Sequence, residues 1–214
     1  PLRKQIYELK TKSMEKKPDL AKTALVIRKG PLKARFVRIV NPVKQSFLHL
    51  AEVEVYQGEK NLALSGKASQ ISTGFNGPAK LAIDGNTNGD YFVSKSVTHT
   101  EKADGPWLEI DLGSEQAIDR VRVFNRTDGG AGNRLQRFWA VAYDDKRRPV
   151  WAHLNKKSPN PKWEGTLPQT HEAFSKSDRE SLVSYSKIDQ PSPGDELANK
   201  LKDLEKKQYH YYHN

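Results

Sequence analysis

The 214-residue sequence contains no cysteine. This absence excludes a disulfide framework, thiolate zinc sites, CxxC redox chemistry and a cysteine nucleophile. The chain also lacks any run near the ~20 apolar residues that a membrane-spanning helix needs, so we expect a soluble protein with no membrane span. The GxSxG, HExxH, Walker and GxGxxG motifs are absent too. We therefore predict that the protein is not an enzyme.

The net charge of +10 is unevenly distributed along the chain. Residues 1–34 carry ten Lys and Arg against three Asp and Glu, residues 35–155 carry sixteen against fourteen, and residues 156–214 carry ten against nine. A basic chain suggests a polyanion partner such as nucleic acid. Because the excess positive charge lies in the N-terminal arm, we predict that nucleic acid is not the partner.

Both ends of the chain show helical periodicity. Apolar residues recur at helical spacing over residues 2–17 and again over 195–204, among many Lys and Glu residues. We expect a basic helix and linker over residues 1–33, and a helix and tail over 192–214. Their apolar stripes are thin, so these helices would pair with each other or dock on a larger chain. Because the first residue is Pro1 and not Met, we expect a piece of a larger protein.

The middle of the chain reads as an all-β domain over residues 34–155, since short runs there are bounded by Gly, Asn, Asp and Pro. In residues 52–55 and 120–124, apolar and charged residues alternate, as in strands with one face on a core. The predicted fold is an antiparallel β-sandwich, or jelly roll. Residues 156–191 show no periodicity and are predicted to be an irregular wrap or linker. The predicted strands are Ala34–Val40, Leu48–Gln57, Trp107–Leu112, Ile118–Asn125, Phe138–Tyr143 and Val150–Leu154.

One loop, Leu81–Asp90, concentrates Asp, Asn and Gly. Hard cations select oxygen ligands on a tight turn, although the spacing here is not that of an EF-hand. The same composition suits a β-turn held by bonds from Asx side chains to the backbone. Both interpretations stay open from the composition.

A second polar group consists of His99, Arg126, Asp128 and Arg134, the last three around a Gly-rich loop. An arginine beside an aspartate is commonly a structural ion pair. The same residue types also suit sugar recognition. In that case a guanidinium fork donates to neighbouring hydroxyl groups, a carboxylate orients it, and an apolar side chain covers the C–H face of the sugar.

The spacing of this group is specific. Twenty-six residues separate His99 from Arg126, and Asp128 follows two positions after Arg126. This pattern resembles the F-type lectin (fucolectin) family, within the discoidin-like, galactose-binding-domain-like group, and the resemblance covers residues 34–155. It also rests on the motifs Asn61–Gln70, Ala82–Asn86, Thr98–Thr100, Pro106–Leu112 and Asn125–Asp128.

The resemblance implies a non-catalytic, calcium-stabilised module that binds L-fucose or a related sugar on glycans. It implies that His99 and Arg126 hydrogen-bond the sugar, that Asp128 orients Arg126, and that Phe92 faces the sugar methyl group. Arg134 would be the last basic residue of the site. An extracellular, periplasmic or cell-surface location, in a lectin-like insert of a larger bacterial protein, is also implied.

Two features depart from the family pattern. Asn133 stands where the pattern expects the last basic residue, so Arg134 comes one position late. Gly129-Gly130 stands where relatives often have adjacent cysteines. The alternative function is therefore a sugar-inactive scaffold for protein–protein docking within a larger assembly. In that alternative Arg134 points away from His99 and Arg126.

The order of the strand motifs predicts a circular permutation. The family's domains end with a strand like FVRI and a segment like LCEVEV, whereas this chain has the corresponding Phe36–Ile39 and Leu50–Val55 before the rest of the domain. We expect the usual last strand to come first, so that Glu52 completes the ion site. By resemblance, the predicted Ca²⁺ ligands are Asp84, Ser96, Glu52 and the backbone carbonyl groups of Leu81, Asn86 and Ala51.

Overall fold

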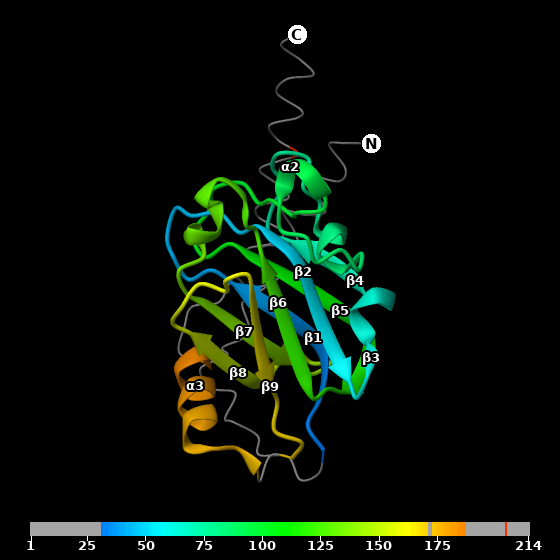
Figure 1. Ribbon diagram of the computed structural model, residues 1–214. Coiled ribbons are helices and arrows are strands. Elements are labelled where there is room, and N and C mark those ends of the chain that lie inside the picture. The colour runs from blue at the N-terminus through cyan, green and yellow to red at the C-terminus, as the bar shows by residue number, and fades with distance from the viewer. Residues whose placement is uncertain (1–30, 171–172, 187–203, 205–214) are drawn as a thin grey trace. The chain divides into compact units, whose positions relative to one another are not determined.

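A computed structural model of the chain describes residues 31–170, 173–186 and 204. Its described strands form two antiparallel sheets packed face to face (Figure 1). One sheet has five strands in the order β4-β5-β1-β7-β8, and the other has four in the order β3-β2-β6-β9. The predicted β-sandwich is confirmed.

All six predicted strands are present, and shorter elements join them. The strands are β1 (Lys33–Val40), β2 (Leu50–Gln57), β3 (Lys60–Asn61), β4 (Lys67–Gln70), β5 (Trp107–Ala117), β6 (Arg120–Asn125), β7 (Phe138–Tyr143), β8 (Pro149–Asn155) and β9 (Lys162–Thr166). The α-helices are α2 (Tyr91–Ser94) and α3 (Lys176–Ser186), and the 3-10 helices are η2 (Leu62–Ser65), η3 (Ala79–Ile83) and η4 (Asp128–Arg134).

The core lies between the two sheets and follows the alternation seen in the sequence. On β6, Val121 and Val123 are fully buried, whereas Arg120 and Arg122 on the opposite face remain partly accessible. The valines of β6 pair in register with those of β2, and Val53 lies opposite Val123. Burying such side chains contributes roughly 1.5–3 kcal/mol each, so the alternation fixes which face of each strand turns inward.

The two strands that come first in the chain complete both sheets. β1 lies in the middle of its sheet, paired with β5 on one side and β7 on the other. β2 pairs with β6 in the second sheet. The motifs Phe36–Ile39 and Leu50–Val55 are therefore integral to this sandwich.

The prediction for residues 156–191 was wrong where the structure describes them. β9 pairs with β6 along the edge of the four-stranded sheet, and Trp163 on β9 packs edge-to-face on Phe138 at 5.3 Å between ring centroids. α3 begins at a capping box, in which the Ser175 hydroxyl accepts from the backbone N–H of Asp178 at 3.1 Å, and it buries Leu182 and Tyr185. Short elements with few apolar residues gave too weak a periodic signal to be recognised.

The helices expected near the chain ends lie outside the described residues, apart from Leu204. Within the part of the chain that the structure describes, no helix is both long enough and apolar enough to cross a lipid bilayer.

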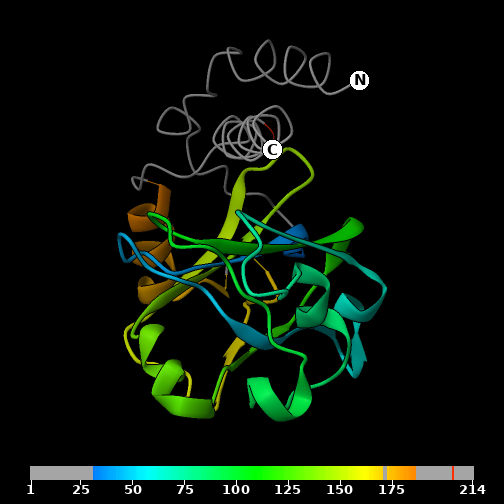
Figure 2. The same cartoon turned by 90° about the horizontal axis from the view of Figure 1, so that it is seen from above.

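One end of the sandwich carries the loops that hold the predicted site. Both α2 and η4 lie at this end, beside each other in two perpendicular views (Figures 1 and 2). The loop before α2 closes tightly on the end of β6, because the backbone N–H of Thr127 donates to the carbonyl of Gly89 at 2.9 Å. A Cβ atom at Gly89 would stand 2.3 Å from the carbonyl oxygen of Asn125. This approach requires glycine.

Replacing Gly89 with alanine should therefore lower the free energy of unfolding by about 1–3 kcal/mol, because a backbone oxygen cannot rotate away from the added methyl group. Urea denaturation measures this change. Thr87→Ala, an exposed substitution two residues away, should change stability by less than about 0.5 kcal/mol. Equal stability of Gly89→Ala and the parent protein would contradict the close approach.

Candidate functional site

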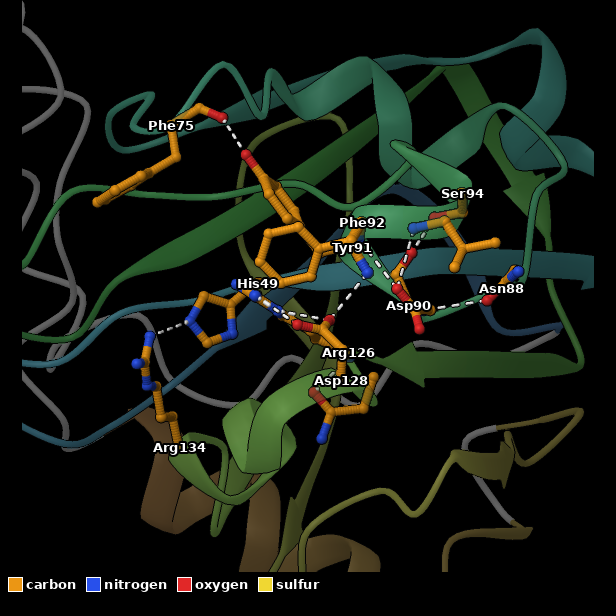
Figure 3. A network of polar contacts seen from close by, with 12 residues as sticks. His49, Phe75, Asn88, Asp90, Tyr91, Phe92, Ser94, Arg126, Asp128 and Arg134 are labelled. Atoms are coloured by element: carbon orange, nitrogen blue, oxygen red, sulfur yellow. Dashed lines mark hydrogen bonds and ion pairs between the residues drawn. The ribbon is translucent and has the colours of Figure 1, made fainter.

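Arg126 and Asp128 form a planar, two-point ion pair where β6 ends (Figure 3). Nε of Arg126 donates to Oδ1 of Asp128 at 2.9 Å, and Nη2 donates to Oδ2 at 2.7 Å. The backbone N–H of Tyr91 also donates to Oδ1, at 2.8 Å. These bonds favour the carboxylate and lower the pKa of Asp128 to about 2, with the Arg126 hydrogen bond as the largest cause. Asp128 is thus a permanent anion that orients Arg126.

The guanidinium of Arg126 is fixed from a second side by an aromatic ring. Its central carbon lies 4.6 Å from the centroid of the Tyr91 ring. Asp128 engages Nε and one N–H of Nη2, so both N–H groups of Nη1 and the second of Nη2 are left to donate to a ligand. The pairing between Arg126 and Asp128 seen in the sequence serves both interpretations, since the ion pair is structural and also orients a donor.

His99 lies at the base of this site and is only 3% exposed. Its Nδ1 stands 2.7 Å from the carbonyl oxygen of Thr100, which can only accept, so Nδ1 carries the proton. Burial lowers the pKa of His99, and the positive charges of Arg126 and Arg134 lower it further. The neutral ring presents Nε2 as an acceptor, and Nε2 has no hydrogen-bond partner among the described residues.

Arg134 turns toward the same place, and a histidine outside the predicted set joins the groups. Nη1 of Arg134 lies 3.4 Å from Nε2 of His49, and the His49 ring lies 4.6 Å from the His99 ring, centroid to centroid. Arg134 therefore lies beside the His49–His99 pair. Arg126 lies over Tyr91, whose hydroxyl donates to the carbonyl of Phe75, and the Phe75 ring packs on His99, so these contacts connect both arginines to His99. His49 lies fifty positions before His99, outside the spacing that identified the site. Hydrogen bonds from Leu48 and Leu50 to Thr100 and Thr98 bring the two histidines together.

The loop of η4 leads from Asp128 to Arg134. Gly129 and Gly130 adopt φ values of 55° and 70°, a left-handed conformation that glycine takes without a Cβ penalty. The carbonyl of Gly132 accepts from the side chains of Asn125 at 2.9 Å and Ser158 at 3.1 Å. This loop is therefore anchored immediately before Arg134.

Two exposed aromatic side chains stand beside the polar groups. Phe92 on α2 is 71% exposed and packs edge-to-face on Tyr91 at 5.3 Å. Phe75 is not among the predicted site residues. It is 66% exposed, and its ring lies 4.6 Å from that of His99. The Tyr91 hydroxyl donates to the Phe75 carbonyl at 2.8 Å (Figure 3). Apolar surface thus adjoins the donors and acceptors.

The buried imidazole of His49 should make folding sensitive to acid. Burial, with the nearby positive charges, lowers the pKa of His49 to about 3 in the folded protein, whereas the unfolded value is about 6.5. Because the unfolded chain gains a proton below pH 6.5 that the folded protein does not, stability from this group falls as the pH falls.

Urea unfolding at pH 7 and pH 5 tests this effect by comparing the parent protein with His49→Gln. The difference in unfolding free energy between the two proteins should shrink by about 2 kcal/mol at pH 5. Glu52 changes stability in the opposite direction over this range, since its pKa is raised when folded, but it is common to both proteins and cancels. A pH-independent difference would contradict the assignment.

A separate cluster of oxygen groups joins β2 to the Asp/Asn-rich loop. Oε1 of Glu52 accepts from the backbone N–H of Gly85 at 3.1 Å, and the hydroxyl of Ser96 donates to Oδ2 of Asp84. Glu52 is fully buried, and its Oε2 has no hydrogen-bond partner. Burial raises the pKa of Glu52 to about 8, and the charge of Asp84 raises it as well.

The residues of this cluster fit a hard cation. All the groups brought together are oxygen donors, which Ca²⁺ prefers, and the partnerless buried oxygen of Glu52 is the kind of group that a cation satisfies. Of the other predicted ligands, Leu81 lies on η3, Asn86 follows Asp84 in the loop, and Ala51 is buried on β2 beside Glu52. The structure thus places all six residues on β2, η3 and the segment up to Ser96.

The other interpretation of the loop Leu81–Asp90, a turn held by Asx side chains, also holds for part of the loop. The side chains of Asp84, Asn86 and Asn88 each accept from a backbone N–H two residues later, at 2.9, 3.1 and 3.0 Å. These Asx turns shape the loop. They engage Oδ1 of Asp84 and leave Oδ2 toward Ser96, so turn formation and an ion site do not exclude each other.

Comparison with known proteins bears on this geometry. A family model described as a NedA-like, galactose-binding domain of the F5/F8 type C group matches residues 81–173. Over 76 residues the chain is 40% identical to Fucolectin-6 of Anguilla japonica, and over 75 residues it is 36% identical to Fucolectin-5 of the same species. It is 33% identical to the lectin domain of lectinolysin solved with Lewis B antigen, with a TM-score of 0.50, and covers 79% of that domain and 52% of this chain. The chain belongs to the F-type lectin family.

The extent of the likeness differs between relatives. The two matches to the eel fucolectins span 33% of this chain, and they cover 40% and 39% of the fucolectins' own length. The likeness to the lectinolysin lectin domain covers most of that domain. The F-type lectin assignment therefore concerns the β-sandwich and its loops.

Proposed function

We propose that this F-type lectin domain is a non-catalytic, calcium-stabilised module that binds L-fucose or a related sugar on glycans. The observation that supports the proposal is the chain of contacts that connects His99 to Arg134 through His49 and to Arg126 through Phe75 and Tyr91. The names of its relatives, fucolectins and a lectin domain bound to Lewis B antigen, support the same class of ligand.

The site residues would divide the recognition of a sugar between them. Arg126, held in place by Asp128, donates from Nη1 to a sugar oxygen, and His99 accepts a hydroxyl proton at Nε2. Arg134 supplies a second, charged donor. These charge-assisted bonds are directional, so they select the arrangement of the hydroxyl groups. Phe92 offers the apolar contact that a methyl group or a C–H face requires.

Calcium would stabilise the folded domain and would not bind the sugar itself. Glu52, Asp84 and Ser96 would hold the ion, with backbone carbonyl groups of the same segments. The ion supplies positive charge that neutralises the buried carboxylate of Glu52. Because these ligands come from β2 and from the loop that leads into α2, binding would stabilise the segment on which Tyr91 and Phe92 stand.

A single shallow site of this kind binds weakly, and attachment to a larger chain or repetition supplies avidity. We therefore propose that the domain is one module of a larger, extracellular or surface-exposed protein. It would bring that protein to fucosylated or related glycans.

Titration calorimetry with L-fucose, D-galactose and a panel of fucosylated and sulfated glycans, in the presence of Ca²⁺, tests the proposal. We expect saturable binding of fucose-containing ligands that His99→Ala weakens. A folded protein that binds none of these sugars would favour the sugar-inactive scaffold. Binding unaffected by His99→Ala would place the ligand elsewhere on the domain.

A further inference from the structure

We propose that His49 is a positioning residue that holds Arg134 in the sugar site, an inference that rests on the proposed function. Arg134 is exposed at the end of η4 and lies one position later than in the family pattern. An exposed arginine samples many rotamers, and fixing it when a ligand binds costs affinity. Contacts within this chain must therefore hold Arg134 in the site.

Arg134 is held by contacts with three residues. Nη1 lies 3.4 Å from Nε2 of His49, and the guanidinium carbon lies 5.5 Å from the Phe47 ring centroid. Its backbone carbonyl accepts from the Asn41 side chain at 3.4 Å. The head group and the backbone of Arg134 are thus both held by the segment that links β1 to β2.

His49 is itself rigid. It is 1% exposed, and its ring lies 4.6 Å from that of His99 and 6.3 Å from that of Phe47. Because a guanidinium only donates, Nε2 of His49 must accept, and the ring proton lies on Nδ1. A buried ring with one tautomer gives Arg134 a fixed anchor.

The chemistry of the anchor distinguishes the two arginines of the site. Arg126 is neutralised by a carboxylate, which occupies two of its nitrogen atoms. Arg134 is held by an uncharged imidazole, and it makes no ion pair with another described residue. Its positive charge and its remaining N–H groups therefore stay available to a ligand. His49 thus holds Arg134 in place without competing with a ligand for its positive charge.

The test compares L-fucose affinity in five variants with the parent protein. His49→Leu should weaken binding ~5- to 10-fold, because the arginine loses its order. His49→Gln keeps an acceptor and should recover binding to within ~3-fold of the parent. In the double variant His49→Leu/Arg134→Ala, affinity should be no lower than in Arg134→Ala alone. His153→Gln removes a half-buried histidine that stacks on Trp163 and should leave affinity unchanged.

Full affinity in His49→Leu, or independent losses that multiply in the double variant, would overturn the inference. A readout without ligand separates it from the proposed function. In ¹⁵N spectra of the imidazole rings, Arg134→Ala should shift the Nε2 resonance of His49 and leave that of His153 in place. An unchanged His49 resonance overturns the inference even if sugar binds. If the parent protein binds no sugar, the proposed function fails, and the spectra still decide whether His49 holds Arg134.

Discussion

Replacing Arg126 with alanine should lower the affinity for L-fucose by ~100-fold, the largest loss expected from any single substitution in the site. The reason is that Arg126 is the most completely pre-oriented donor. Asp128 holds it through two hydrogen bonds, and the Tyr91 ring lies against its guanidinium. Arg126→Lys keeps the charge but loses the planar fork, and should lose most of the affinity as well. Calorimetric titration measures both.

The matched control for this experiment is Arg122→Ala. Arg122 lies on the same strand, β6, but pairs with Glu164 on the outer face of the sheet. Its removal should leave the affinity for L-fucose unchanged. Thermal unfolding of each variant checks that the fold is kept, because Arg126→Ala leaves the charge of Asp128 without its main partner. A folded Arg126→Ala protein with parental affinity would disprove the role given to Arg126.

Calcium should raise the melting temperature of the parent protein, and Glu52→Gln should abolish that response. At a Ca²⁺ concentration 100 times the Kd, binding adds about 2.7 kcal/mol to stability, or on the order of 5–10 °C for a domain of this size. Without the ion, burial raises the pKa of Glu52 to about 8, so the side chain is protonated at pH 7. Gln has nearly the same shape as that neutral form, and the chelated proteins should therefore melt at similar temperatures.

Glu54→Gln is the control for this comparison, since Glu54 lies two residues away on β2 and pairs with Arg122. Its melting temperature should rise with Ca²⁺ as in the parent protein. Differential scanning calorimetry with added CaCl₂ and with a chelator makes the measurement. A parent protein whose melting temperature ignores Ca²⁺ would refute the ion site, and a calcium response that persists in Glu52→Gln would move the site away from β2.

The fold could be predicted where tertiary packing produces a recognisable pattern of apolar and polar residues along the chain. The strict alternation in residues 120–124 follows from a strand with one face on the core, and β6 has that form. β9 leaves no such signal, because it has five residues and only Trp163 is a large apolar side chain. Its place is decided by pairing with β6 and by the surface that Phe138 offers to Trp163. The residue pattern within β9 does not reveal these contacts.

The same division holds for the site. The interval between His99 and Arg126 identified two of its members, because it matches the spacing of a known family pattern. His99 lies in a segment without regular secondary structure, and Arg126 directly follows β6. His49 and Phe75 could not be found in this way, since neither belongs to that interval. His49 comes near His99 because Leu48 and Leu50 hydrogen-bond to Thr100 and Thr98, and Phe75 does so because the loop before η3 returns to His99.

By itself, the sequence determined the sandwich, the family and the polar residues that lie within one continuous motif. It also showed that most of the +10 charge belongs to residues 1–34, whereas residues 35–155 are nearly balanced. Only the tertiary structure decided that the late Arg134 still turns into the site, and that Glu52 meets Gly85 and Asp84 from a strand far away in the chain. The reason is physical: alternation and spacing are fixed by neighbouring residues, whereas the direction of a side chain at a loop end depends on which distant group is packed beneath it.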